Sequence, residues 1–249
     1  MHARRRQLPG LASIAALWMA AAFAHAANLQ VAPTMVKVPA ERAAEGLTLS
    51  NSGDVVLHAQ VRVFQWLQRD GEDVLVPTQD IAISPPMLEV QGGGTQLVRI
   101  VRLGPPPQDG IEASYRLLVD ELPIDLPPEQ GAGLRFVLQY SIPVFLSPPG
   151  SVAVSPRLQA RLRDEGDRRT LELANEGNGH AQIVDLAYVS PEGVRINIAH
   201  GLAGYVLPGN RRQWPLPDGI SSTDGGTFTA RVNGDADERT LAIDAPLHH

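Results

Sequence analysis

Hydrophobic and polar residues alternate with a period of two along most of this chain. The runs that show it most clearly are Thr48–Ser50, Ala59–Trp66, Gln96–Leu103, Tyr115–Val119, Leu134–Phe145, Thr170–Ala174 and Gln182–Leu186. Successive side chains of a strand point to opposite faces, so this period predicts half-buried β-strands. No window longer than ten residues repeats apolar positions convincingly at helical spacing.

Turn-forming residues separate these runs. Asn51–Asp54 and Asn175–Gly179 each follow a predicted strand, and Gly92–Gly94 is expected to be a hairpin loop. Short strands with turns at intervals of roughly 8–12 residues are typical of an all-β sandwich or barrel. The pattern therefore predicts an all-β fold.

The segment Ser147–Ser151 divides the chain into two parts. Its sequence, Ser-Pro-Pro-Gly-Ser, breaks a strand and stiffens a short linker. In a chain of 249 residues, each part then has the length of one β-sandwich domain. We expect an N-terminal domain at residues 27–147 and a C-terminal β-sandwich domain at residues 148–249.

Residues 1–26 have the pattern of a secretory signal peptide. Three arginines, Arg4–Arg6, precede the apolar run Leu11–Ala24, and Ala24-His25-Ala26 is the small-x-small pattern of a cleavage site. At about 14 residues the run is shorter than the roughly 20 that a membrane span needs. The sequence therefore predicts an exported protein that starts near Ala27 and has no membrane span after cleavage.

Composition excludes several classes of function. The chain has 21 Lys and Arg against 27 Asp and Glu, a net charge of −6, which argues against a nucleic-acid partner. It has no cysteine, so thiol catalysis, disulfides, cysteine zinc sites and iron–sulfur clusters are excluded.

Catalytic and metal-binding motifs are equally scarce. His58, His180 and His200 are isolated from one another, and we interpret them as surface or half-buried residues rather than metal ligands. Gly92–Gly94 lacks the Lys of a P-loop, and no Gly-x-Ser-x-Gly elbow occurs. The sequence predicts a protein that is not an enzyme and needs no cofactor or metal.

One predicted strand carries unusually large side chains on a single face. These residues are Leu134, Phe136, Leu138 and Tyr140. In one interpretation the face fills the core of its own domain. In the other it lies outside that domain and is offered to a partner. Periodicity alone does not decide between the two.

Several segments resemble the periplasmic pilus-assembly chaperones of the chaperone–usher pathway. They are Leu47–Asn51, Gln96–Arg99, Tyr115–Pro123 and Leu134–Phe145 in the first half, and Leu173–Ala181 and Gly204–Gly209 in the second. The most specific is Tyr115–Pro123. Together with Pro33-Thr34 and Val63–Trp66, it resembles the archaic branch, which serves spore-coat-U-type pilins.

This resemblance implies two immunoglobulin-like β-sandwich domains arranged like a boomerang. It also implies a periplasmic protein of a Gram-negative bacterium that folds and caps pilin subunits and delivers them to an outer-membrane usher without ATP. The last strand of the first domain would complete the subunit's open core, a mode of recognition by strand addition. The donated side chains would be Leu134, Phe136, Leu138 and Tyr140.

The chain departs from the family where the subunit's C-terminal carboxylate is held. Other members use an Arg on the first strand and a Lys on the donor strand, and Met35 and Pro143 occupy these positions here. The anchor has therefore moved, or hydrophobic contacts act alone. The candidate replacements, which are equally compatible with solvated strand charges, are Lys37, Arg102 and Arg116. By the same resemblance, Arg99 and Glu112 would form a structural ion pair that braces the cleft.

Two other classes of protein also fit an exported chain of β-sandwiches. An adhesin or carbohydrate-binding module would need an exposed aromatic platform, but aromatic residues are only 5% of the chain and Trp66 and Trp214 are the only tryptophans beyond the signal. A copper–zinc sandwich enzyme would need clustered histidines. Both observations weigh against these alternatives.

Overall fold

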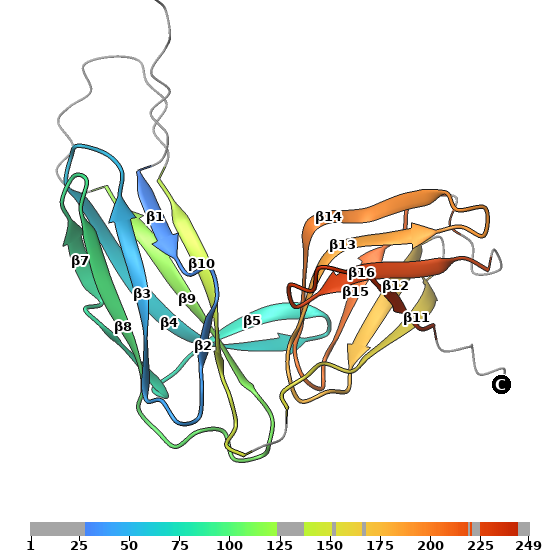
Figure 1. The fold of residues 1–249 in the computed structure, drawn as a ribbon, viewed down its shortest axis with the longest axis horizontal. Coiled ribbons are helices and arrows are strands. Elements are labelled where there is room, and N and C mark those ends of the chain that lie inside the picture. The colour runs from blue at the N-terminus through green and yellow to red at the C-terminus, as the bar shows by residue number, and fades with distance from the viewer. Residues whose placement is uncertain are drawn as a thin grey trace, which may run out of the picture.

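Seventeen β-strands and no helix make up the described part of the chain, which comprises residues 28–123, 137–150, 153–165, 168–218, 220 and 225–243 of a computed structural model. The expected signal peptide, Leu134 and Phe136 lie outside the described residues. The strands form two β-sandwiches set at an angle to each other (Figure 1). The predicted all-β, two-sandwich architecture is confirmed.

The first sandwich is built from strands β1 to β10. One of its sheets has the order β1 (Leu29–Ala32), β3 (Ala44–Asn51), β8 (Thr95–Arg102) and β6 (Ile81–Ser84). The other has the order β2 (Val36–Val38), β10 (Gln139–Leu146), β9 (Ala113–Leu122), β4 (Leu57–Arg69) and β5 (Glu72–Pro77), with β7 (Met87–Val90) also paired to β4. Alternate residues of both sheets, such as Leu47, Ile100 and Leu117, fill the core between them.

The second sandwich is built from strands β11 to β17. Its smaller sheet has the order β11 (Leu158–Glu165), β12 (Arg168–Asn175) and β15 (Arg211–Pro215). Its larger sheet has the order β14 (Arg195–Val206), β13 (Ala181–Val189), β16 (Thr227–Val232) and β17 (Arg239–Leu241). Leu171, Ile183 and Phe228 lie at its core. The predicted boundary at Ser147 falls between the end of β10 and the start of β11.

The alternating runs of the sequence correspond to β3, β4, β8, β9, β10, β12 and β13. The interpretation of Gly92–Gly94 as a hairpin loop is wrong. This segment connects β7 with β8, and these strands pair with β4 and β3 in different sheets. A glycine-rich turn therefore carries the chain from one layer of the sandwich to the other.

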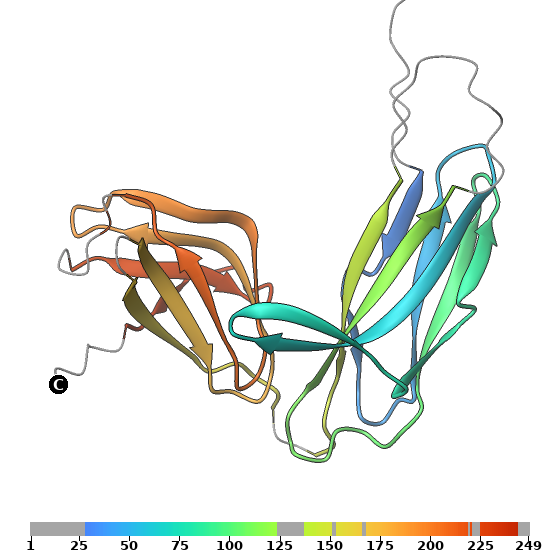
Figure 2. The same ribbon diagram turned by 180° about the vertical axis from the view of Figure 1, so that it is seen from behind.

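Strands β4 and β5 form a long hairpin that the alternation did not reveal. Arg69 pairs with Glu72, so the loop is Asp70-Gly71, and both residues have positive φ angles of 52° and 83°. This is the geometry that an Asp-Gly hairpin turn favours. The hairpin extends beyond the first sandwich and reaches the second domain (Figures 1 and 2).

Strand β10 has one edge that is only partly covered. On one side it pairs with β9 along its whole length, from Gln139 to Leu146. On the other side it pairs with β2 only at Val144–Leu146. Within the described residues, no strand pairs with this side of Gln139–Pro143. We call this segment the open edge.

Each domain contains a buried asparagine at the end of a strand. Asn51 ends β3 and Asn175 ends β12, and their side chains are 2% and 1% exposed. Asn175 Nδ2 donates to the carbonyls of Gly179 and Val206, at 2.8 and 3.0 Å, while its Oδ1 accepts from two backbone N–H groups. Asn51 makes the same kind of contacts in the first domain. One amide thereby satisfies backbone groups that the turn leaves without strand partners.

Replacing Asn175 with Ala should destabilise the second domain, because buried carbonyls would lose their donors. We expect a loss of about 3 kcal/mol in the free energy of unfolding, measured by urea titration. Asn197→Ala, at an exposed position of β14, serves as the control and should change stability by less than about 0.5 kcal/mol. Equal effects of the two changes would contradict this role of the buried amide.

Candidate functional site

The two sandwiches meet through a small aromatic cluster. Trp66 at the far end of β4 packs against Phe145 of β10 and Tyr205 of β14, with ring centroids 6.1 and 5.3 Å apart. These side chains and Leu207 are buried, and Met35 packs against them. Aromatic pairs at these distances stabilise a contact beyond their buried area. The interface is therefore a hydrophobic core of its own, in addition to those of the two sandwiches.

A buried glutamine adds backbone-directed contacts to this interface. Gln68 follows Trp66 on the same face of β4, and its side chain is 6% exposed. Its Nε2 donates to the carbonyl of Tyr205 and its Oε1 accepts from the N–H of Leu207, both at 2.9 Å. The amide thus pairs with the main chain of the second domain as a neighbouring strand would. This pairing orients the second domain relative to β4.

Glu112 and His180 form a buried pair across the interface. His180 Nδ1 lies 2.6 Å from Glu112 Oε1, and the side chains are 3% and 4% exposed. The His180 ring stacks on Phe145 with the centroids 3.6 Å apart. The Glu112 N–H donates to the carbonyl of Asn178, so backbone and side chain both tie the domains together.

This pair corrects two expectations from the sequence. The Glu112 side chain pairs with His180 of the second domain, and Arg99 is not its partner. Arg99 lies exposed on β8, whereas Glu112 directly precedes β9, a strand of the other sheet. His180 is fully buried rather than a surface or half-buried residue. Nothing in the sequence links two residues that are 68 positions apart.

Arg116 on β9 lies next to the aromatic cluster. Its guanidinium carbon is 3.6 Å from the centroid of the Trp66 ring and 5.2 Å from that of Tyr205. Its Nη1 donates to the carbonyl of Ser141 at 3.5 Å. Burial lowers the pKa of Arg116, because the charged form is partly removed from water. No carboxylate among the described residues lies within salt-bridge distance of it.

The other two candidate cations have different surroundings. Arg102 donates to the carbonyls of Ala40, Arg42 and Gly104, so its guanidinium holds the loop that follows β2. Lys37 is exposed on β2, opposite Phe145 in the strand register. Lys37 therefore lies beside Phe145, one residue of the aromatic cluster, but within the described part of the chain only Arg116 of the three lies over the rings of that cluster.

Two of the four large side chains predicted to share one strand face, Leu138 and Tyr140, lie at the margin of the first domain's core. Leu138 and Tyr140 are half-buried and pack against that core. The Tyr140 hydroxyl donates to the carbonyl of Leu29 at 2.6 Å. Of the two interpretations of this face, these two residues fit the one in which it contributes to the core of its own domain.

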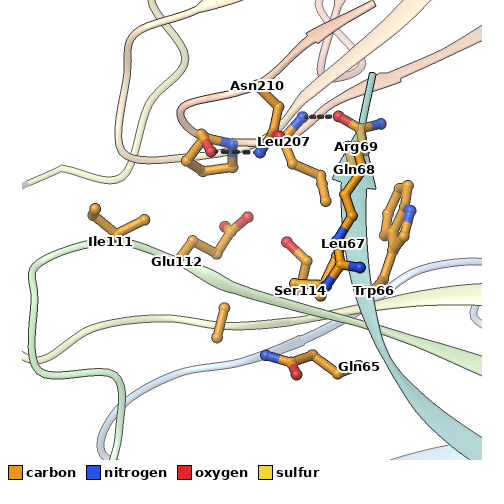
Figure 3. A pocket seen from close by; sticks show the side chains of 12 residues that line it. Gln65, Trp66, Leu67, Gln68, Arg69, Ile111, Glu112, Ser114, Leu207 and Asn210 are labelled. Carbon is orange, nitrogen blue, oxygen red and sulfur yellow. Dashed lines mark hydrogen bonds between the residues drawn. The ribbon is translucent and has the colours of Figure 1, made fainter. Parts of the chain in front are cut away.

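A cavity of about 360 Å³ lies at the root of the β4–β5 hairpin, where β4, β9 and the second domain meet (Figure 3). Its lining includes Leu67, Glu112, Ser114 and Asn210. Neither Arg116 nor β10 contributes to the lining. The cavity is thus separate from the open edge.

Sequence analysis did not assign a role to Trp66, Gln68, Tyr205 or His180. The Asp70-Gly71 turn was the available signal, because it indicates a hairpin directly after the Trp66 segment. Trp66 and Trp214 are 1% and 7% exposed, so neither forms the aromatic platform that a carbohydrate-binding module would need.

Within the described ranges, no cluster of three or more His, Cys, Asp or Glu side chains could hold a metal ion. The same ranges contain no helix long and apolar enough to cross a membrane.

Together these features define a two-domain immunoglobulin-like protein with an open strand edge beside its domain interface. Residues 28–151, about half of the chain, match the family described as "Pili and flagellar-assembly chaperone, PapD N-terminal domain". The chain belongs to this family through its first domain, and the resemblance seen in the sequence is confirmed. A comparison of the sequence with curated proteins gives no match.

Solved structures of pilus chaperones share the fold over both domains. The CsuC–CsuE chaperone–tip adhesion subunit pre-assembly complex, from archaic chaperone–usher Csu pili of Acinetobacter baumannii, matches with a TM-score of 0.69 and 24% identity, over 87% of this chain and 98% of that one. The Pseudomonas aeruginosa CupB2 chaperone gives 0.63 and 16%, over 86% and 100%. The periplasmic chaperone SfaE gives 0.56 and 18%, over 85% and 98%.

Replacing Glu112 with Leu should weaken the coupling between the domains, since His180 would remain buried without its partner. Losing one member of a buried pair costs about 3–5 kcal/mol. We expect calorimetry to show the two sandwiches unfolding in separate transitions, where the unmodified chain unfolds in one.

The control is Glu89→Leu, which removes a carboxylate that is 63% exposed and 3.7 Å from His58. This change should leave the single transition intact. A single, unshifted transition for Glu112→Leu would contradict the role of the buried pair.

Proposed function

We propose that this protein is a periplasmic chaperone that holds pilin subunits by donor-strand complementation through β10. The observation that carries the proposal is the open edge at Gln139–Pro143. An unpaired strand edge is a template for another strand, and proteins normally cover or shorten such edges. Here the edge lies beside the domain interface, where a subunit could contact both domains.

The hydrogen-bonding groups of the open edge face away from β9. The N–H of Glu121 donates to the carbonyl of Leu138, so these two residues form a hydrogen-bonded pair of the β9–β10 ladder. Antiparallel ladders alternate between such pairs and pairs that do not bond to each other. Gln139 and Ser141 therefore direct their backbone groups toward the open side, and both residues are exposed.

The donated side chains in this proposal remain Leu134, Phe136, Leu138 and Tyr140. The last two point toward the core side of the first domain, so an added subunit would extend that core rather than cover an outer face. Burying each side chain contributes about 1.5–3 kcal/mol. Four such contributions, less the entropy of ordering, are enough to hold a subunit without ATP or another cofactor.

Arg116 is the proposed anchor for the subunit's C-terminal carboxylate. Its guanidinium is fixed over Trp66 and partly dehydrated, and among the described residues Asp73 acts on it only from beyond salt-bridge distance. A dehydrated cation gains more from an anion than a solvated one does. Because β10 runs from the open edge toward the interface, a strand that ends at Arg116 would pair with β10 in parallel.

The similar structures support the remaining parts of the proposal. One is a chaperone with a tip adhesion subunit from an archaic system, and another is a periplasmic chaperone. We therefore propose spore-coat-U-like pilin subunits as partners and delivery to an outer-membrane usher. The expected signal peptide would direct export to the periplasm. The protein would act by binding rather than by catalysis.

Replacing Ser141 with Pro should block subunit capture while leaving the chaperone folded. Proline lacks the N–H that Ser141 directs to the open side, and the β9 ladder does not use that group. We expect pull-down of a co-expressed pilin to fail and the thermal melt of the isolated variant to shift by only a few degrees.

The matched control is Ser141→Ala, which keeps the N–H and removes only the hydroxyl. It should capture pilin as the unmodified chain does. Normal capture by Ser141→Pro, with a normal melt, would argue against strand addition at β10.

Replacing Arg116 with Met should weaken capture roughly ten- to a hundredfold, because a charge-assisted contact contributes about 1.5–3 kcal/mol. Arg99→Met is the control, since Arg99 is also a strand arginine but is exposed on β8, in the sheet that does not contain β10. Titration of purified pilin would measure both affinities. Equal affinities for the two variants would contradict the assignment of the anchor.

A further inference from the structure

Pro143 occupies the point where the open edge of β10 ends. It is buried, and the next residue, Val144, is the first that pairs with β2. By the alternation of the β9–β10 ladder, residue 143 directs its backbone groups to the same side as Gln139 and Ser141. A residue with an N–H would therefore offer one more donor to an added strand there. Proline offers none.

We infer that Pro143 is a register stop that fixes where the last residue of the added strand lies. This inference rests on the proposed function. An added parallel strand finds donors at Gln139 and Ser141, but none at residue 143. If the added strand were two residues longer, one of its backbone carbonyls would be buried opposite the proline ring and would find no N–H donor. At the same point β2 begins to occupy the edge. A buried carbonyl without a partner is unfavourable.

The position of Arg116 links the register stop to recognition of a terminal carboxylate. Arg116 lies directly opposite Pro143 in the register of β9 and β10. These two residues form a pair that does not exchange hydrogen bonds, the kind in which side chains approach most closely. The end of the available edge and the guanidinium of Arg116, which has no carboxylate at salt-bridge distance among the described residues, therefore coincide. A strand that stops at Pro143 presents its terminal carboxylate at Arg116.

The two features together select partners by the length of their last strand. A polypeptide whose final strand ends in a free carboxylate can hydrogen-bond to the open edge and also form an ion pair with Arg116. A chain that continues beyond Pro143 must leave either a backbone carbonyl without a donor or Arg116 without a carboxylate. Pro143 thus acts as a positioning residue, and the ligand it selects is the C-terminal strand of a subunit rather than an internal segment.

The test compares two forms of one subunit on the full-length chaperone. The probe is a spore-coat-U-type pilin, either unmodified or with Thr-Val added after its C-terminal residue. For the unmodified chaperone we expect at least tenfold weaker binding of the extended pilin. For Pro143→Ala, which restores an N–H at the open edge, we expect the tenfold preference to fall at least threefold while the unmodified pilin is still bound, and the remaining preference comes from β2 and Arg116.

Pro77→Ala is the matched control, because Pro77 is an exposed proline at the end of another edge strand, β5. It should keep the full preference. Pro143→Val provides a second variant with an N–H and a strong strand preference, and it decides the test if Pro143→Ala does not fold.

Two results would overturn the stop while leaving the proposed function intact. In one, the unmodified chaperone binds both pilins equally. In the other, Pro143→Ala or Pro143→Val retains the tenfold preference. Failure to bind either pilin would instead refute strand addition by this protein, and the stop with it.

Discussion

The contact between the far end of β4 and the second domain determines the rest of the architecture. Trp66 and Gln68 lie beyond the part of β4 that belongs to the first sandwich, and both are buried against β14 and the residues after it. Because a paired strand is stiff, this contact sets the angle between the sandwiches. It also supplies the aromatic rings that hold Arg116. The site is therefore a product of the interface rather than of either domain alone.

The open edge of β10 combines exposure with protection. An exposed edge favours aggregation unless it is short, charged or interrupted. Here β2 covers one end, Pro143 removes a donor, and Asp120 on β9 binds both Gln139 and Arg62 beside the edge. The exposed backbone between these features is only a few residues long. The same devices that limit unwanted pairing also restrict which strand can pair productively.

The sequence predicted features that depend on neighbouring residues of the chain, and it did not predict contacts between distant segments. Period-two alternation located strands such as β4 and β9, because a half-buried strand must alternate. The Asp70-Gly71 turn was equally local, but its significance depended on how far β4 continues. The Glu112–His180 pair joins two domains, so no spacing could indicate it, and the expected partner, Arg99, lies in the opposite sheet. Arg116 was one candidate among three until the fold placed it beside Trp66.

The length of β4 also has a consequence for how this protein can change in evolution. Its 13 residues run without interruption from the first sandwich to the second domain. An insertion of a single residue between Val61 and Trp66 would turn every later side chain to the opposite face of the strand. Trp66 and Gln68 would then leave the interface together. The number of residues in β4 is therefore fixed by the distance between the domains, in addition to the identities of Trp66 and Gln68.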